Sequence, residues 1–171
     1  MQIIPTVLEN NPRDVINQII RLSPYFHTFQ IDVVDGVFAP NKTPSAYELV
    51  SVFINNQQLT TNGVYDFHLM TKDFENEISA IAQLTNKVKI RNIMIHIALS
   101  PNYYLLSKTF PQFTFGPVLS SEDNVYEAMK DYNINSFRFL QFMTVHIGAQ
   151  GNPFIDIVLK KIEQLKKGGF T

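Results

Sequence analysis

The stretch Thr28-Phe29-Gln30-Ile31-Asp32-Val33-Val34 decides the fold, because this β-rich run is followed by the amphipathic run Ser45–Ile54. The same alternation of β-rich and helical periodicity continues along the chain. Six such pairs in series predict a parallel sheet whose crossover connections are helices. The expected pairs are Ile3–Leu8 with Pro12–Leu22, Thr28–Val34 with Ser45–Ile54, Val64–Met70 with Phe74–Leu84, Asn92–Ala98 with Tyr103–Lys108, Phe113–Leu119 with Asn124–Asp131, and Phe137–Val145 with Pro153–Lys167.

A parallel sheet of this kind is either doubly wound and open or closed as a barrel. An open nucleotide-binding sheet usually has a glycine-rich turn after its first strand, but here residues 5–11 contain no glycine. The barrel is therefore favoured, and in a parallel barrel the chemistry collects where the strands end. The expected strand ends are Thr6, Asp32–Asp35, His68–Met70, His96–Ser100, Val118–Ser120 and Met143–Gly148.

Composition limits the class of protein and the partners it can bind. A chain of 171 residues, 45% hydrophobic and 17% charged, can bury the core of one globular domain. With a net charge of −1, the chain has no excess of positive charge with which to bind nucleic acid or an anionic membrane. No apolar stretch is long enough to span a bilayer. The sequence has no cysteine, which removes disulfides and thiolate chemistry and favours a cytoplasmic location.

Polar side chains stand near the ends of two expected strands. Alternation along the strand directs Gln30 and Asp32 to one side, and in the next strand it aligns His68 with Met70. If these strands are neighbours, a carboxylate and an imidazole come together, which suits a divalent metal or an acid–base pair. The residues alone leave two other interpretations open: a structural aspartate with a hydrogen-bonded partner, and a histidine satisfied by backbone groups.

Four blocks of the sequence match one known family in order and spacing. Ile4–Leu8, Ile31–Thr43, Asp66–Met70 and Met143–Val145 resemble the ribulose-phosphate 3-epimerase family, and Gly148–Ile155 is similar to that family's glycine-rich phosphate loop. The resemblance covers essentially all 171 residues. It implies an α/β fold of the TIM (β/α)-barrel type. It also implies an isomerase that interconverts D-ribulose 5-phosphate and D-xylulose 5-phosphate by metal-assisted proton transfer at C3.

The resemblance implies a role for each matched residue. Asp32 would be the acid–base residue and a metal ligand, with His68 as a second ligand and Gln30 at the position of a third. The implied cofactor is a divalent ion, Zn, Fe, Mn or Co, which would stabilise charge on an enediolate. The implied contacts to the sugar phosphate come from Thr6, His68, Met70, Met143, Gly148 and Gly151.

The sequence also departs from the family. Gln30 stands where the family has a histidine ligand and would weaken binding of a zinc-like ion, and Val34 replaces a methionine. The segment Met143–Gly151 lacks the family's proline and one glycine. These departures leave three functions open: a ribulose-phosphate 3-epimerase, an epimerase of another ketose phosphate, and an inactive barrel that binds sugar phosphate or a partner.

The last residue, Thr171, comes before the family's seventh and eighth strands. We therefore expect residues 1–171 to form a single ribulose-phosphate-binding domain with about six of the eight strand–helix units, lacking the last two. Open edges of a parallel sheet invite association, so this expectation includes a homo-oligomer.

Overall fold

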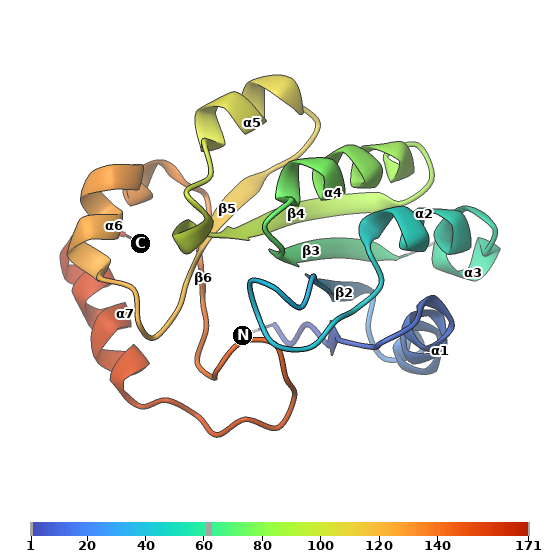
Figure 1. The fold of residues 1–171 in the computed structure, drawn as a ribbon, viewed down its shortest axis with the longest axis horizontal. Coiled ribbons are helices and arrows are strands. Elements are labelled where there is room, and N and C mark those ends of the chain that lie inside the picture. The colour runs from blue at the N-terminus through green and yellow to red at the C-terminus, as the bar shows by residue number, and fades with distance from the viewer. Residues whose placement is uncertain (1, 61–62, 171) are drawn as a thin grey trace.

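The computed structural model describes residues 2–60 and 63–170, and its central element is a six-stranded sheet. The strands follow the chain order from β1 to β6, and every neighbouring pair is parallel. A doubly wound sheet changes direction partway through its strand order, whereas a barrel adds each strand beside the previous one. The strand order therefore confirms the barrel type. Figure 1 shows the sheet curled as a partial (β/α) barrel with helices on its outer side.

Each strand is followed by helical structure, as the alternating pattern predicted. The strands are β1 (Thr6–Val7), β2 (Thr28–Val34), β3 (Val64–Met70), β4 (Lys89–His96), β5 (Phe115–Leu119) and β6 (Gln141–Phe142). The helices are α1 (Pro12–Leu22), α2 (Ala46–Ile54), α3 (Gln57–Thr60), α4 (Phe74–Ile81), α5 (Tyr103–Thr109), α6 (Val125–Tyr132) and α7 (Ile157–Lys167). Short 3-10 turns lie at Ala82–Leu84, Ile97–Leu99 and Ile134–Ser136; the first falls within the helix predicted over Phe74–Leu84, whereas the other two and α3 were not predicted.

The predicted boundaries are most accurate in the first half of the chain. The segments Pro12–Leu22, Thr28–Val34 and Val64–Met70 are confirmed to the residue. The strand predicted over Ile3–Leu8 contains only the two residues of β1, and the one predicted over Phe137–Val145 only the two of β6. Both strands end the described strand order, where a strand has one hydrogen-bonding neighbour, so fewer of their backbone groups are held in the ladder.

Side-chain caps explain where the first two long helices begin. The Asn11 side chain accepts a hydrogen bond from the Asp14 N–H at 3.0 Å, immediately before the proline that starts α1. At α2, Ser45 Oγ accepts from the Glu48 N–H at 3.3 Å while the Glu48 carboxylate accepts from the Ser45 N–H at 2.8 Å. This capping box ends the loop after β2 at a defined point, so it helps to position the carboxyl end of that strand.

The main hydrophobic core lies between the outer face of the sheet and the helices. Phe29, Ile31 and Val33 of β2 are buried in it, in contact with apolar residues of the helices. Successive strand residues point to opposite faces, so Gln30 and Asp32 point into the curl of the sheet. The two faces of one strand therefore serve different purposes: one packs the core, and the other presents polar groups to the interior.

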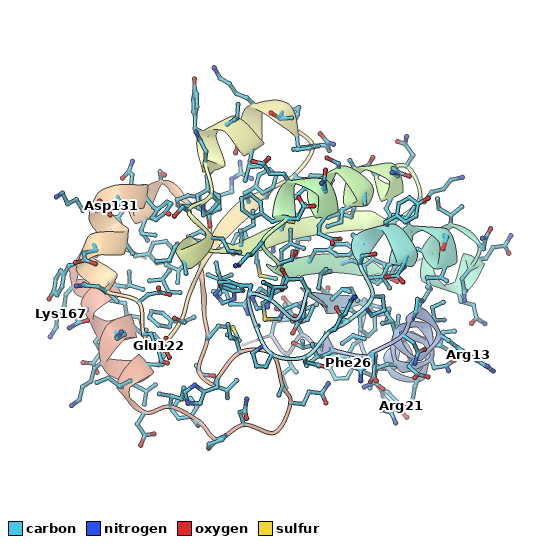
Figure 2. All side chains as sticks on the ribbon, in the orientation of Figure 1. Arg13, Arg21, Phe26, Glu122, Asp131 and Lys167 are labelled. Atoms are coloured by element: carbon cyan, nitrogen blue, oxygen red, sulfur yellow. The ribbon has the colours of Figure 1, made fainter. Side chains whose placement is uncertain are left out.

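Charged side chains of both signs lie at the periphery of the molecule. Arg13 and Arg21 project from α1, while Asp131 and Lys167 project from α6 and α7 (Figure 2). In the part of the chain that the structure describes, no helix combines the length and the apolar character that crossing a bilayer requires. These surface charges are separate from Gln30 and Asp32, the polar residues that point into the curl of the sheet.

Truncation of Leu49 measures how much the outer core stabilises the fold. Leu49 lies on α2 and is 1% exposed. We expect Leu49→Ala to lower the free energy of unfolding by about 2–5 kcal/mol, because it removes buried apolar surface and leaves a cavity. Urea denaturation followed by circular dichroism measures the change. Leu105→Ala, at a helical position that is 54% exposed, is the matched control, and equal losses in the two variants would contradict this assignment of the core.

Candidate active site

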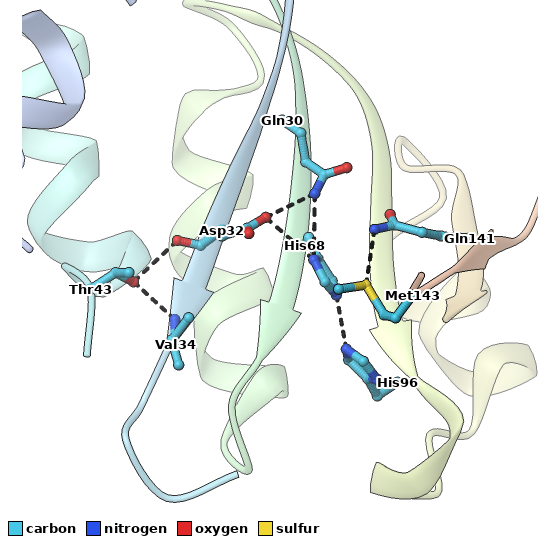
Figure 3. A network of polar contacts seen from close by, with 8 residues as sticks. All are labelled: Gln30, Asp32, Val34, Thr43, His68, His96, Gln141 and Met143. Atoms are coloured by element: carbon cyan, nitrogen blue, oxygen red, sulfur yellow. Dashed lines mark hydrogen bonds and ion pairs between the residues drawn. The ribbon is translucent and has the colours of Figure 1, made fainter. Parts of the chain in front are cut away.

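Three polar side chains from β2 and β3 meet inside the curl of the sheet, as Figure 3 shows. The parallel register pairs Asp32 directly with His68. Asp32 Oδ1 lies 3.3 Å from His68 Nδ1 and accepts a hydrogen bond from Gln30 Nε2 at 2.9 Å. Gln30 Nε2 also lies 3.5 Å from His68 Nδ1. The carboxylate, the amide and the imidazole singled out in the sequence thus come together at one place, where His68 is fully buried and Asp32 is 9% exposed.

The chemistry of this donor set fits a divalent ion. Ligands of one tetrahedral ion at about 2.0–2.2 Å stand roughly 3–3.5 Å from one another, which is the separation of Asp32 Oδ1 and His68 Nδ1. Rotation of the Gln30 amide by half a turn would bring its oxygen to the place where its nitrogen now lies. No group of three His, Cys, Asp or Glu side chains suited to a metal occurs in residues 2–60 and 63–170. Gln30 is the third polar side chain at this place, beside Asp32 and His68.

The carboxyl end of β2 is held by hydrogen bonds from the loops around it. Thr43 Oγ1 donates to the Asp32 carbonyl oxygen at 3.1 Å and accepts from the Val34 N–H at 2.9 Å. The Asp35 carboxylate accepts from the Lys72 N–H at 2.8 Å and from two N–H groups of its own loop. Partial burial raises the pKa of Asp35, but these hydrogen bonds together outweigh burial and hold the pKa below its usual value. Asp35 therefore links the loops after β2 and β3, and Asp32 is the carboxylate that faces inward.

A second histidine lies behind His68. His96, the last residue of β4, is fully buried, and its Nε2 lies 2.9 Å from His68 Nε2. Its ring centre lies 5.1 Å from that of Phe38, in the loop after β2. Burial, and then the neighbouring His68, lower the pKa of His96 to about 3, so its ring is neutral. The sequence predicted His96 near a strand end, but the contact with His68 depends on strand register and no local pattern indicates it.

A cavity of 390 Å³ opens beside these groups. Its walls include residues of β1, β2, β3, β6 and the segment after β6. The predicted site residues that line it are Thr6, Gln30, Asp32, Met70, Met143, Gly148 and Gly151. His68 does not line the cavity and touches the site through Asp32 and Gln30. The structure thus brings all the predicted site residues to one region.

The cavity wall also contains His146, which the sequence placed near a strand end, and polar residues that were not assigned a site role from the sequence, among them Gln141 and Asn152. Gln141 Nε2 donates a hydrogen bond to the sulfur of Met143 at 3.5 Å. Alternation in the strand could have indicated Gln141, because it lies two residues before Met143 and therefore on the same face. Asn152 follows no strand periodicity, so only the course of the loop places it here.

The segment after β6 closes one side of the cavity. Gly148 has a φ of +89°, and a Cβ atom there would collide with the carbonyl oxygen of Pro40 in the loop after β2. Gly151 has a φ of +79°, but a Cβ atom there would meet open space. Gln150 Nε2 donates to the Leu8 carbonyl oxygen at 3.3 Å and so joins this segment to the end of β1. Packing against the β2 loop therefore requires glycine at 148, whereas at 151 only the backbone conformation favours it.

A larger cavity of 980 Å³ lies at α5, β5 and the segment after α6. Its lining includes Tyr103, Tyr132, Phe137 and Arg138, and it contains none of the predicted site residues. The smaller cavity contains the inward carboxylate and lies where the strands end, the face that holds the active site in parallel barrels. We therefore take the smaller cavity as the candidate active site.

The fold and the site together define a partial (β/α) barrel with a carboxylate and two histidines at the carboxyl ends of its strands. The particular family follows from comparison with known proteins. The model of the Ribulose-phosphate 3 epimerase family matches residues 2–169. The chain belongs to the ribulose-phosphate 3-epimerase family.

Two curated relatives come from Helicobacter pylori, and both are named ribulose-phosphate 3-epimerase. The protein of strain ATCC 700392 / 26695 is 24% identical over 169 residues, which make up 98% of this chain and 72% of that protein. The protein of strain J99 / ATCC 700824 is 22% identical over 169 residues, with the same two shares. Together with the family match, these relatives support a ribulose-phosphate 3-epimerase-like function.

Replacing Gly148 and Gly151 by alanine, one at a time, distinguishes the effect of side-chain packing from the effect of backbone strain on stability. Both glycines have a φ in the left-handed region, so alanine should cost about 1–2 kcal/mol at either position. Gly148→Ala also drives a Cβ atom into the Pro40 carbonyl group. We therefore expect it to lower the free energy of unfolding by about 1–3 kcal/mol more than Gly151→Ala does. Guanidinium denaturation of both variants measures the difference, and equal effects would mean that the segment after β6 does not pack on Pro40.

Proposed function

We propose that this protein interconverts D-ribulose 5-phosphate and D-xylulose 5-phosphate by moving a proton at C3, with Asp32 as an acid–base residue. The observation that carries the proposal is the Asp32 carboxylate in the wall of a cavity of 390 Å³, with Gln30 and His68 beside it. Family membership supports the same chemistry.

The residues around Asp32 suit a proton transfer next to a ketone. Such a reaction needs a base within reach of the C–H bond and a way to stabilise the negative charge that develops on oxygen. Asp32 would take the C3 proton on one face of the planar enediolate, and inversion at C3 would require a second acid–base group to return a proton on the opposite face. Met70 and Met143 line the same cavity. Their thioethers have no acidic proton, so the wall that they form cannot compete with Asp32 as a proton donor.

We propose Gln30, Asp32 and His68 as ligands of a divalent ion, Zn, Fe, Mn or Co. A cation bound there would supply positive charge that stabilises the negative charge developing on the substrate oxygens. Gln30 would contribute a neutral amide oxygen, a harder donor than an imidazole nitrogen. The distances among the three side chains support the binding of one cation by all three.

The remaining cavity residues are proposed to hold the sugar phosphate. The Thr6 hydroxyl on β1 would contact the sugar; the position of Thr6 in the cavity wall, together with Asp32, supports this. At the segment after β6, backbone N–H groups near Gly148 and Gly151 would bind the phosphate. Residues 1–171 would act as one ribulose-phosphate-binding domain. The single sheet supports this, and the absence of cysteine supports a cytoplasmic location.

Isotope exchange tests the proposed role of Asp32. The wild-type protein, supplied with Mn²⁺ or Zn²⁺, should incorporate deuterium from D2O at C3 of D-ribulose 5-phosphate. Asp32→Asn should lower the rate of exchange by about 10²–10⁴-fold, because the amide cannot accept the proton. Proton NMR of the sugar phosphate measures the exchange.

The matched control is Asp131→Asn, which makes the same change at an exposed position on α6. We expect its exchange rate to equal that of the wild type. Exchange that persists in Asp32→Asn would overturn the role of Asp32. A folded wild-type protein that shows no exchange would overturn the proposed enzymatic function and favour a barrel that only binds sugar phosphate.

Restoring a histidine at position 30 tests the ligand set. Gln30→His replaces the amide oxygen by an imidazole nitrogen, which zinc prefers, so the Kd for Zn²⁺ should fall by about tenfold, or ~1.4 kcal/mol. Isothermal titration calorimetry measures the Kd. Gln58→His adds a histidine at an exposed position on α3 and controls for zinc binding to surface imidazoles. An equal gain in both variants would count against Gln30 as a ligand.

A further inference from the structure

His96 is a buried polar residue that the proposed mechanism does not use. It neither lines the cavity nor belongs to the proposed ligand set, and it is fully buried. Its Nε2 contacts His68 Nε2 at 2.9 Å, while its Nδ1 has no partner among the described residues. Burial of an unpaired polar nitrogen destabilises the folded state. The one polar contact that accompanies this unfavourable burial is with a proposed metal ligand.

The contact between the two rings requires one proton. Of two nitrogens 2.9 Å apart, one must donate and the other must accept. If His96 donates, a neutral His68 carries its own proton on Nδ1, between that ring and the Asp32 carboxylate 3.3 Å away. If His68 donates, its Nδ1 has a free lone pair that faces Asp32 and Gln30. The direction of this hydrogen bond therefore decides which nitrogen of His68 is available to a cation.

We propose that His96 is a positioning residue for the metal site: its Nε2 accepts the hydrogen bond from His68 Nε2–H and keeps the His68 Nδ1 lone pair directed at a divalent cation. The inference rests on the ligand set proposed above. Metal-binding histidines usually donate their other ring N–H to an acceptor, which fixes both the tautomer and the ring orientation. Here the acceptor is a second histidine: the two ring planes differ by 26° with their centroids 5.0 Å apart, so the rings meet edge to edge at their Nε2 atoms.

The surroundings of His96 support this role. The His96 ring also packs against Phe38, which offers no hydrogen-bond acceptor in its side chain. An apolar ring would fit a site of this kind without leaving an unpaired nitrogen. The polarity of His96 is therefore explained by the nitrogen that faces His68 and not by packing.

Two substitutions separate the hydrogen bond from the packing. His96→Phe keeps a ring and removes the acceptor, whereas His96→Gln can accept through its amide oxygen. We expect His96→Phe to raise the Kd for Zn²⁺ by about 10–100-fold, as loss of an outer partner of a ligand usually does, and His96→Gln to stay within about threefold of the wild type. Isothermal titration calorimetry without sugar phosphate measures these values. His27→Phe, at an exposed position, should leave the Kd unchanged.

Nitrogen-15 NMR of the histidine rings supplies a readout that a purely structural role would not move. The chain has four histidines, so the signals of His68 can be assigned by substitution. In the zinc-bound wild-type protein, His68 should carry its proton on Nε2. A proton on Nδ1 would overturn the inference, even if His96→Phe proves too unstable to purify.

The outcomes distinguish this inference from the proposed function. Wild-type zinc affinity in folded His96→Phe would overturn the positioning role, and so would a wild-type protein that binds no Zn²⁺. A wild-type protein that shows the expected zinc binding and tautomer but no exchange at C3 would instead overturn the epimerase function and leave the role of His96 intact.

Discussion

The parallel pairing of β2 with β3 is the constraint on which the rest of the structure depends. Its register sets Asp32 beside His68. The same alternation sends Phe29, Ile31 and Val33 to the outer core. A slip of one residue would move Asp32 into that core and an apolar side chain into the cavity, so it would destabilise the fold and remove the site together. The register that buries the core therefore also places the polar groups.

The polar groups inside the curl form a connected series. Gln30 contacts Asp32, Asp32 contacts His68, and His68 contacts His96. Buried polar groups are tolerated when they are paired, and well-packed apolar residues are often as stable or more stable in their place. Stability alone therefore does not explain this series. The adjoining cavity does, because it gives the outermost members, Gln30 and Asp32, access to a ligand.

Among the strands, the sequence predicted β2 and β3 most accurately; β4 also pairs on both sides, but it runs over Lys89–His96 and not over the predicted Asn92–Ala98. Thr28–Val34 and Val64–Met70 were predicted to the residue because each is a continuous β-rich run in the middle of the sheet. The extended strand predicted over Phe137–Val145 was wrong, because only β5 pairs with this segment among the described strands. The apolar pattern of the sequence extends beyond Gln141–Phe142 and so predicted a longer strand, but only these two residues pair in the sheet as β6.

The location of the site could also be predicted, because short motifs at strand ends carry Asp32, His68 and Met143. The contacts between His96 and His68 and between Gly148 and Pro40 could not. Both depend on how neighbouring strands are staggered and how far the sheet curls, and local periodicity contains neither quantity. The roles of the residues in catalysis and metal binding remain proposals that rest on chemistry and on the family.

The hydrogen bond from Gln150 to Leu8 has a consequence for how the molecule forms. It joins residues 142 positions apart, whereas β2, β3 and β4 pair with strands close to them in sequence. Contacts between distant residues close long loops, and the entropy of that closure slows the step that makes them. The central strands can assemble from near neighbours, but the cavity wall that this bond completes depends on bringing the two ends of the chain together. The cavity wall at Gln150 thus belongs to the slow, entropically costly part of folding, whereas Asp32 and His68, on neighbouring central strands, belong to the fast part.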